Sequence, residues 1–176
     1  MKKILLCLLV LIQVCLSVSA FYENTDYDIN AEEIVSFDVN SDKLNINAKN
    51  AILYDRTYKK ILYSKNINEK VPNASTTKML TAIVAYENGD MDDIVTISSK
   101  AANTGGSCVK FRTGDKITLG DLMKGLLLCS GNDAAVAIAE HIAGTGEKFC
   151  EMLNEKAGEI GAYNTHFVSP HGLDNE

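Results

Sequence analysis

The sequence lacks three features that would indicate other common classes of protein: a cluster of basic residues, a Cys-x-x-Cys pair and a long uninterrupted apolar run. Its 176 residues carry a formal net charge of -6 and give a pI near 5.1. Proteins that follow nucleic-acid phosphates concentrate Lys and Arg on one face, so no nucleic acid is expected as a partner. The content of 46% hydrophobic and 23% charged residues is typical of a globular chain of about one domain.

Cysteine and histidine are too scattered to indicate a metal site. An odd number of cysteines follows residue 20, namely Cys108, Cys129 and Cys150. They do not predict a disulfide framework, although one pair could form. A structural role is favoured for each of the histidines His141, His166 and His171. We therefore expect neither a metal nor a cofactor.

The N-terminus has the order of a secretory signal peptide. Lys2 and Lys3 precede an apolar run, and small residues stand just before residue 21. A membrane anchor is the alternative, but Gln13 interrupts the run, which is shorter than the ~20 residues that a spanning helix needs. We predict a signal peptide over residues 1–20, a mature chain that begins near Phe21, and export.

Residues 21–47 differ in composition from the rest of the chain. They hold seven acidic residues and one lysine with little periodicity, which predicts a flexible, acidic lead-in. The folded part is expected from residue 48. Two short runs rich in Ile, Leu and Tyr, NAILYDR at 50–56 and KILYSKN at 60–66, are separated by a brief polar turn. This pattern predicts a β-hairpin.

Apolar residues recur at helical spacing after Pro72 and predict a buried helix that ends at Gly89. Its apolar positions are Met79, Leu80, Ile83, Val84 and Tyr86. The run DIVTIS that follows is β-prone. Three more helices are expected over LGDLMKGLLLC (119–129), DAAVAIAEHIAG (133–144) and EKFCEMLNEKAGEIG (147–161). Thr118 with Asp121 resembles a cap of the first, the second is a core helix, and Phe149, Leu153 and Ile160 lie near one face of the third.

The stretch PNASTTKML places Ser75 and Lys78 one helical turn apart. A serine needs a base within hydrogen-bond reach to act as a nucleophile, and a lysine becomes that base when burial lowers its pKa. The alternative is a helix N-cap at Ser75 with a solvated Lys78. A second Ser-x-x-Lys, formed by Ser107 and Lys110, shows that the spacing by itself is not specific.

Ser130, Gly131 and Asn132 form a polar break between two apolar helices. A hydroxyl there could relay a proton to a leaving group, and an amide could hold both the lysine and a substrate carbonyl. The alternative is a simple turn in which Ser130 or Asn132 caps the following helix.

Ser-x-x-Lys at a helix start followed by Ser-x-Asn between two helices is the motif order of penicillin-binding proteins and class A β-lactamases. The segments VPNASTTKMLTAIVAYENGDMDD, DKITLGDLMKGLLLCSGNDAAVAIAEHIAG and NTHFVSPHGLD resemble the serine-type D-alanyl-D-alanine carboxypeptidases, the low-molecular-weight penicillin-binding proteins of peptidase family S11. The resemblance runs from about Asn45 to the last residue. It implies an α/β (α+β) fold of the β-lactamase/transpeptidase type, in which a sheet is combined with a helical subdomain.

The resemblance also implies the roles of individual residues. Ser75 would be the acylated nucleophile, Lys78 its general base, Ser130 the proton relay and Asn132 a contact to the substrate and the lysine. The implied partners are peptidoglycan stem peptides that end in D-Ala-D-Ala, with β-lactams as covalent inhibitors. The implied location is the cell wall or the outer face of the cytoplasmic membrane. Ser107 matches a surface loop of the family.

The sequence departs from the family pattern in two respects, a missing motif and an end at Glu176, where the family is expected to continue into further strands. It contains no Lys-Thr-Gly, which the family carries on a strand downstream of Ser-x-Asn, and Arg112-Thr113-Gly114 imitates this motif but precedes Ser130. We therefore interpret residues 48–176 as a partial catalytic domain, truncated before the later strands and without the C-terminal region through which the family contacts membranes. A β-lactamase of related fold and a catalytically incomplete remnant are the alternatives.

Overall fold

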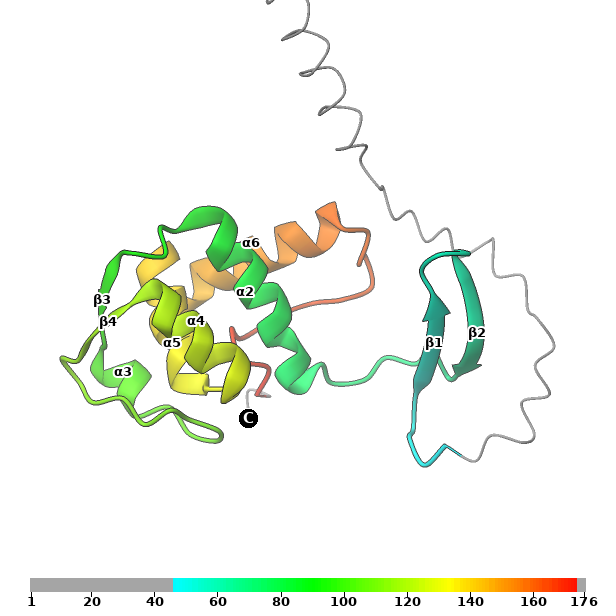
Figure 1. Cartoon of the computed structure of the whole chain (residues 1–176), viewed down its shortest axis with the longest axis horizontal. Helices are drawn as coiled ribbons and strands as arrows, with labels where there is room; N and C mark the ends of the chain where they lie inside the picture. Colours follow the sequence, from blue (N-terminus) through cyan, green and yellow to red (C-terminus); the bar gives the residue numbers. More distant parts are fainter. Residues whose placement is uncertain (1–45, 174–176) are drawn as a thin grey trace, which may run out of the picture. The chain divides into compact units, whose positions relative to one another are not determined.

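The computed structural model describes residues 46–173 and shows two compact units that separate between Asn68 and Glu69 (Figure 1). The predicted signal peptide and almost all of the predicted lead-in lie outside the described residues. Among the residues that are described, no helix is both long and apolar enough to cross a membrane.

The first unit contains the predicted β-hairpin, which is confirmed. Strands β1 (Ala51–Asp55) and β2 (Lys60–Lys65) pair antiparallel, with one irregularity after Leu53. The Asp55 carboxylate accepts backbone N–H groups of the turn from Thr57 and Tyr58, at 2.8 and 3.1 Å. An aspartate that binds the backbone two and three residues ahead is a common way to fix a turn.

The second unit is mainly helical. Its elements are η3 (Ala74–Thr76), α2 (Thr77–Asn88), β3 (Ile94–Thr96), α3 (Ser99–Ala102), β4 (Lys116–Thr118), α4 (Leu119–Leu128), α5 (Asn132–Ala143) and α6 (Gly146–Glu159). Helix α5 packs against α2, α3, α4 and α6, and β3 pairs antiparallel with β4 at one end of the unit (Figure 1). The predicted helices and the β-prone run at 94–96 are confirmed, whereas α3 and β4 were not predicted.

Helix α5 is the centre of the core, as its alanine-rich sequence predicts. Ala134, Ala135, Ile138 and Ala139 are fully buried. Small side chains let neighbouring helices approach closely, so large residues of those helices fill the space around α5: Val84, Leu122, Leu126, Phe149 and Leu153. Complete burial of each such side chain stabilises the fold by about 1.5–3 kcal/mol.

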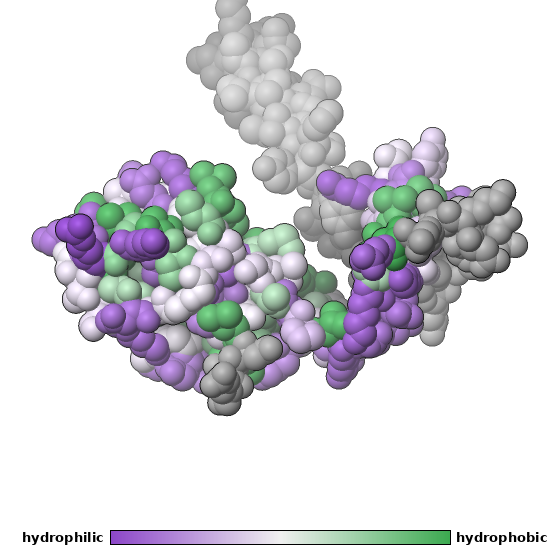
Figure 2. Space-filling view, turned by 90° about the horizontal axis from the view of Figure 1, so that it is seen from below, coloured by the Kyte–Doolittle hydropathy of each residue, from purple (hydrophilic) through white to green (hydrophobic). Residues whose placement is uncertain are grey.

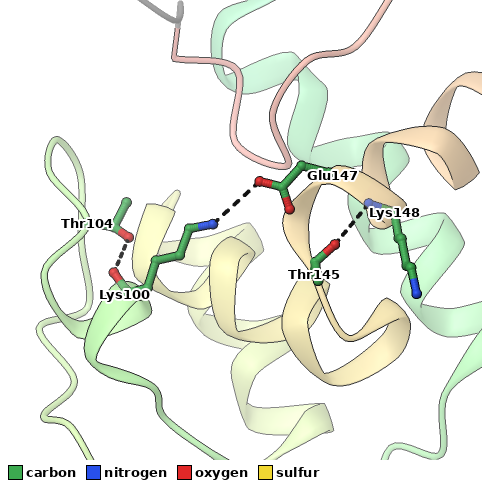
Figure 3. Close-up of polar contacts among 5 residues, drawn as sticks. All are labelled: Lys100, Thr104, Thr145, Glu147 and Lys148. Carbon is green, nitrogen blue, oxygen red and sulfur yellow. Dashed lines mark hydrogen bonds and ion pairs between the residues drawn. The ribbon is translucent and has the colours of Figure 1, made fainter.

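Side-chain caps fix the starts of three helices. At the start of α3, Ser98 Oγ accepts the backbone N–H of Ala101 at 3.0 Å. Thr118 Oγ1 accepts the backbone N–H of Asp121 at 3.1 Å, which confirms the predicted cap of α4. Thr145 does the same for α6 by accepting from Lys148 N at 3.2 Å (Figure 3). Lys100 lies 3.9 Å from Glu147 across the gap between α3 and α6, but both side chains are exposed and such pairs contribute little.

Two predicted apolar faces are partly wrong. In α2, Leu80 and Val84 are buried, but Met79, Ile83 and Tyr86 are 61, 46 and 71% exposed. The face turned to the core is completed by small and polar residues of α2 that a search for large apolar side chains does not select. Beyond α6, Ile160 is also exposed. Figure 2 accordingly shows hydrophobic residues interspersed with hydrophilic ones on the visible face of the second unit.

Candidate active site

The turn before α2 presents Ser75. Ala74 has a φ of 45°, and Ser75 follows in the short 3-10 turn that leads into the helix. The N-cap of α2 is Thr76, with no side-chain cap bond, so the alternative of Ser75 as a helix cap is wrong. A left-handed residue other than glycine costs about 1–3 kcal/mol and is most common at functional sites. The Ser75 side chain is exposed at this turn.

Lys78 is buried beneath Ser75. Its side chain belongs to a residue only 3% exposed, and its Nζ lies 3.1 Å from Ser75 Oγ. The same Nζ donates to the backbone carbonyl of His171 at 3.1 Å. Burial lowers the pKa of Lys78 from its usual value of 10.5, and the charge of Cys108 opposes this shift. The alternative of a solvated lysine is therefore wrong, and Lys78 has the environment that a base needs.

Ser130 approaches Ser75 from the break between α4 and α5. Its Oγ donates to Ser75 Oγ at 3.1 Å, although the two residues are 55 positions apart in the chain. Ser130 has a φ of 53°, which ends α4 and turns the chain into α5. Gly131 is the N-cap of α5 and no side chain caps that helix, so the capping alternatives for Ser130 and Asn132 are wrong.

Asn132 is the first residue of α5 and is buried. Its Nδ2 donates to the carbonyl of Gly105 at 2.7 Å, and its backbone N–H donates to the carbonyl of Ser107 at 2.7 Å. Within residues 46–173, no hydrogen bond joins it to Lys78, whose Nζ bonds to Ser75 and His171 instead. Asn132 thus lies two positions after Ser130 and is bound to the loop that precedes β4, and the predicted contact with Lys78 is not among its hydrogen bonds.

The segment 169–173 completes the surroundings of the lysine, and the sequence analysis missed it. Thr81 Oγ1 donates to the carbonyl of Pro170 at 2.7 Å, which ties the segment to α2. Gly172 has a φ of 80°, and a methyl group on its Cα would collide with the carbonyl of Ala74. Desolvation and the charge of Lys78 both lower the pKa of His171. From the sequence, His171 was assigned only a structural role.

The second Ser-x-x-Lys lies in a loop. Ser107 and Lys110 are exposed, and Lys110 has a φ of 74°, so the pair is not on a helix. The three cysteines that the structure describes are free. No group of three or more His, Cys, Asp or Glu residues in the described part of the chain is placed to hold a metal.

The chain matches the family model described as D-alanyl-D-alanine carboxypeptidase, Peptidase_S11, over residues 35–176. It is 42% identical over 134 residues to the D-alanyl-D-alanine carboxypeptidase DacF of Bacillus subtilis, an overlap of 73% of this chain and 34% of that relative. It is 38% identical over 140 residues to DacC of Escherichia coli, with overlaps of 73% and 35%.

A solved structure gives the same result for the fold. The D-alanyl-D-alanine carboxypeptidase DacD from Francisella tularensis superimposes with a TM-score of 0.71 at 37% identity, covering 76% of this chain and 33% of that one. The β-lactamase/transpeptidase-like fold is therefore confirmed. The chain spans about a third of the length of the curated relatives that it matches. It belongs to the D-alanyl-D-alanine carboxypeptidase family, peptidase S11.

Proposed function

We propose that the chain supplies the nucleophile half of an exported serine D-Ala-D-Ala carboxypeptidase. Such an enzyme removes the terminal D-alanine from peptidoglycan stem peptides, and β-lactams acylate the same serine. The observation that carries the proposal is the position of Ser75 Oγ, which lies 3.1 Å from both Lys78 Nζ and Ser130 Oγ. The names of the matched relatives support the choice of a carboxypeptidase over a β-lactamase.

Acylation begins at Ser75. Neutral Lys78 takes the hydroxyl proton while Oγ attacks the carbonyl carbon of the penultimate D-alanine, and a C–O bond forms. The burial that lowers the pKa of Lys78 raises its neutral fraction near neutral pH. A general base positioned in this way contributes about 10²–10⁴ in rate. The developing oxyanion needs two N–H donors, and the Ser75 N–H at the start of the helical segment is the expected first one.

The leaving group receives its proton through Ser130. Its Oγ is in hydrogen-bond contact with Ser75 Oγ, so it can pass a proton to the amine of the departing D-alanine as the C–N bond breaks. Asn132 holds the substrate from the start of α5. Water then attacks the acyl carbon with Lys78 again as the base, and the shortened peptide and free Ser75 are released.

The 176-residue polypeptide by itself is expected to turn over slowly. The sequence contains no Lys-Thr-Gly. In the family, that strand forms a wall of the site, supplies the second oxyanion donor and binds the substrate's terminal carboxylate. Loss of one oxyanion donor typically costs about 10²–10³ in rate. Weaker positioning of the substrate lowers the rate further.

Fluorescent penicillin tests the proposal. The protein is incubated for a long period with the label, denatured and separated on a gel, and a covalent band that maps to Ser75 in a peptide digest is expected. Release of D-alanine from a pentapeptide that ends in D-Ala-D-Ala is measured in parallel. No band at Ser75 at saturating label would contradict the proposal, and rapid hydrolysis of nitrocefin would favour a β-lactamase.

Export forms part of the same proposal, because the substrate lies outside the cytoplasm. The basic, apolar and small-residue order of residues 1–20 supports it. N-terminal sequencing of the secreted protein is expected to begin near Phe21. A product outside the cell that still begins at Met1 would contradict cleavage.

A further inference from the structure

Asp133 is a buried carboxylate that no role above explains. It is 1% exposed, and within residues 46–173 no ion pair involves it. Its Oδ1 accepts from the backbone N–H groups of Val109 at 3.0 Å and Ala134 at 2.9 Å. Its Oδ2 accepts from Lys110 at 2.8 Å and Phe111 at 3.3 Å. Four N–H dipoles thus replace the hydration of a buried charge.

Three of these donors are successive residues of one loop. Residues 105–111 have no regular secondary structure, and Lys110 is left-handed with a φ of 74°. Three N–H groups in a row that converge on one anion form a compact nest, which holds its backbone in place only while the anion is present. The shape of this loop therefore depends on the charge of Asp133.

The same loop holds Asn132. The carbonyl of Gly105 accepts from Asn132 Nδ2, and the carbonyl of Ser107 accepts from Asn132 N. A Cβ on Gly106 would lie 2.6 Å from Asn132 Nδ2, so the loop backbone runs directly against this amide. The position of the Asn132 amide therefore depends on the position of this loop.

We propose that Asp133 is a positioning residue for acylation. It binds the 109–111 end of the loop, the loop presents the Gly105 carbonyl to Asn132, and the amide of Asn132 is thereby fixed for the substrate. Two consecutive residues of α5 hold the two ends of one loop. This inference rests on the proposed function, because it assigns Asn132 to substrate binding.

Asp133→Asn in the full chain tests the inference. The amide nitrogen that replaces one carboxylate oxygen cannot accept, and each oxygen accepts two backbone N–H groups, so two N–H groups lose their partner. We expect hydrogen exchange of the Val109, Lys110 and Phe111 amides to accelerate by about tenfold or more, an opening that corresponds to the loss of about one hydrogen bond. We also expect the side-chain NH₂ signals of Asn132 to move, and penicillin labelling to slow by up to about 10²-fold, the effect of a misplaced reacting group.

Asp115→Asn is the matched control. Asp115 Oδ2 also accepts a loop N–H, from Arg112 at 2.8 Å, but this bond does not involve Asn132. The control should leave the Asn132 signals and the labelling rate unchanged. Unchanged exchange at 109–111 in Asp133→Asn would overturn the inference, as would an unmoved Asn132 amide. If the unsubstituted protein is not labelled at all, the proposed function fails, and the exchange and NH₂ signals still decide whether Asp133 holds the loop and Asn132.

A second test does not depend on the folding of that variant. In the unsubstituted protein, the amides of Val109, Lys110 and Phe111 should be protected from hydrogen exchange, because each donates to the Asp133 carboxylate. Exchange of these three amides at the rate of an open chain would overturn the inference.

Discussion

The chain contains the same four-residue spacing twice, and the two copies have opposite surroundings. Ser75 and Lys78 span a 3-10 turn and the first turn of α2, and Lys78 is 3% exposed. Ser107 and Lys110 lie in an irregular loop, and both are exposed. Only the first pair brings nitrogen and oxygen within 3.1 Å. The comparison teaches that Ser-x-x-Lys has chemical meaning only where helical backbone aligns the two side chains and burial removes water from the amine.

The largest difference between the two copies is expected for the serines. Ser75→Ala should abolish labelling by fluorescent penicillin, because the atom that forms the covalent bond is gone. Ser107→Ala should label at the rate of the unsubstituted protein. Densitometry of the gel band over time measures both. Comparable loss in the two variants would remove the distinction between the copies.

The next largest effect on the labelling rate is expected for the lysines of the two copies, Lys78 and Lys110. Lys78→Met keeps the apolar stem but cannot accept a proton, so the labelling rate should fall by about 10²–10⁴, the usual contribution of a general base. Lys110→Met, in the exposed copy, should change the rate by less than about twofold, because the Lys110 side chain is exposed and its bond to Asp133 uses the backbone N–H, which the substitution keeps. A normal rate in Lys78→Met would mean that another group is the base.

A stability measurement also separates the two Ser-x-x-Lys copies, because segment 169–173 packs against the copy formed by Ser75 and Lys78. Gly172→Ala should be destabilised by about 1–2 kcal/mol for the left-handed backbone and by about 1–3 kcal/mol more for the collision with the Ala74 carbonyl. Gly161→Ala is the matched control, since Gly161 has the same φ of 80° and open space around it, and should show only the first cost. Urea unfolding measures both. An equal loss of free energy of unfolding in the two variants would mean that segment 169–173 moves to accommodate the added methyl group at no energetic cost.

The smallest expected effect is a dependence on pH. The pKa of Lys78 is lowered in the folded protein, so the unfolded chain binds more protons between that lowered value and 10.5. The free energy of unfolding of the unsubstituted protein, minus that of Lys78→Met, should therefore rise with pH across this window. Below the window this difference should not change with pH. Chemical denaturation at a series of pH values measures the slope.

Lys156 is expected to show the opposite dependence of stability on pH. Ion pairs with Glu159 and Glu87 raise the pKa of Lys156 to about 12. The stabilisation that Lys156 contributes is fully present below pH 10.5 and is lost as the pH rises through about 12. If the free energy of unfolding of the unsubstituted protein, minus that of Lys78→Met, falls as the pH rises in the same experiment, the lowered pKa of Lys78 is contradicted.

Much of the local structure could be predicted, because it depends on neighbours in the chain. The hairpin, the helices and the caps follow from patterns a few residues long, and Gly89 ends α2 as expected. The placement of Ser75 next to Lys78 could also be predicted, because the two residues are three positions apart in the chain. The convergence of Ser75 with Ser130 was foreseen only through the resemblance to a family, since no local pattern relates residues 55 positions apart.

What the sequence did not predict depends on contacts between distant segments. The bond from Lys78 to the carbonyl of His171 joins residues 93 positions apart and uses a backbone atom, which any residue type supplies. Likewise, spacing alone cannot tell that Leu80 faces the core while Met79 and Ile83 do not, because polar and small residues share the buried face of α2. Asp133 was not singled out from the sequence, because three of its four donors lie 22 to 24 positions away in the chain.

The hydrogen bond from Lys78 to the backbone carbonyl of His171 determines which substitutions segment 169–173 can accept. Since Lys78 is held by the main-chain oxygen of residue 171, the imidazole there can be exchanged for other side chains without removing the bond. Gly172, by contrast, lies against the Ala74 carbonyl and admits no side chain. Mutational drift is therefore expected to be permitted at position 171 and blocked at the next position, and a library randomised at both should recover folded proteins with many residues at the first and glycine at the second.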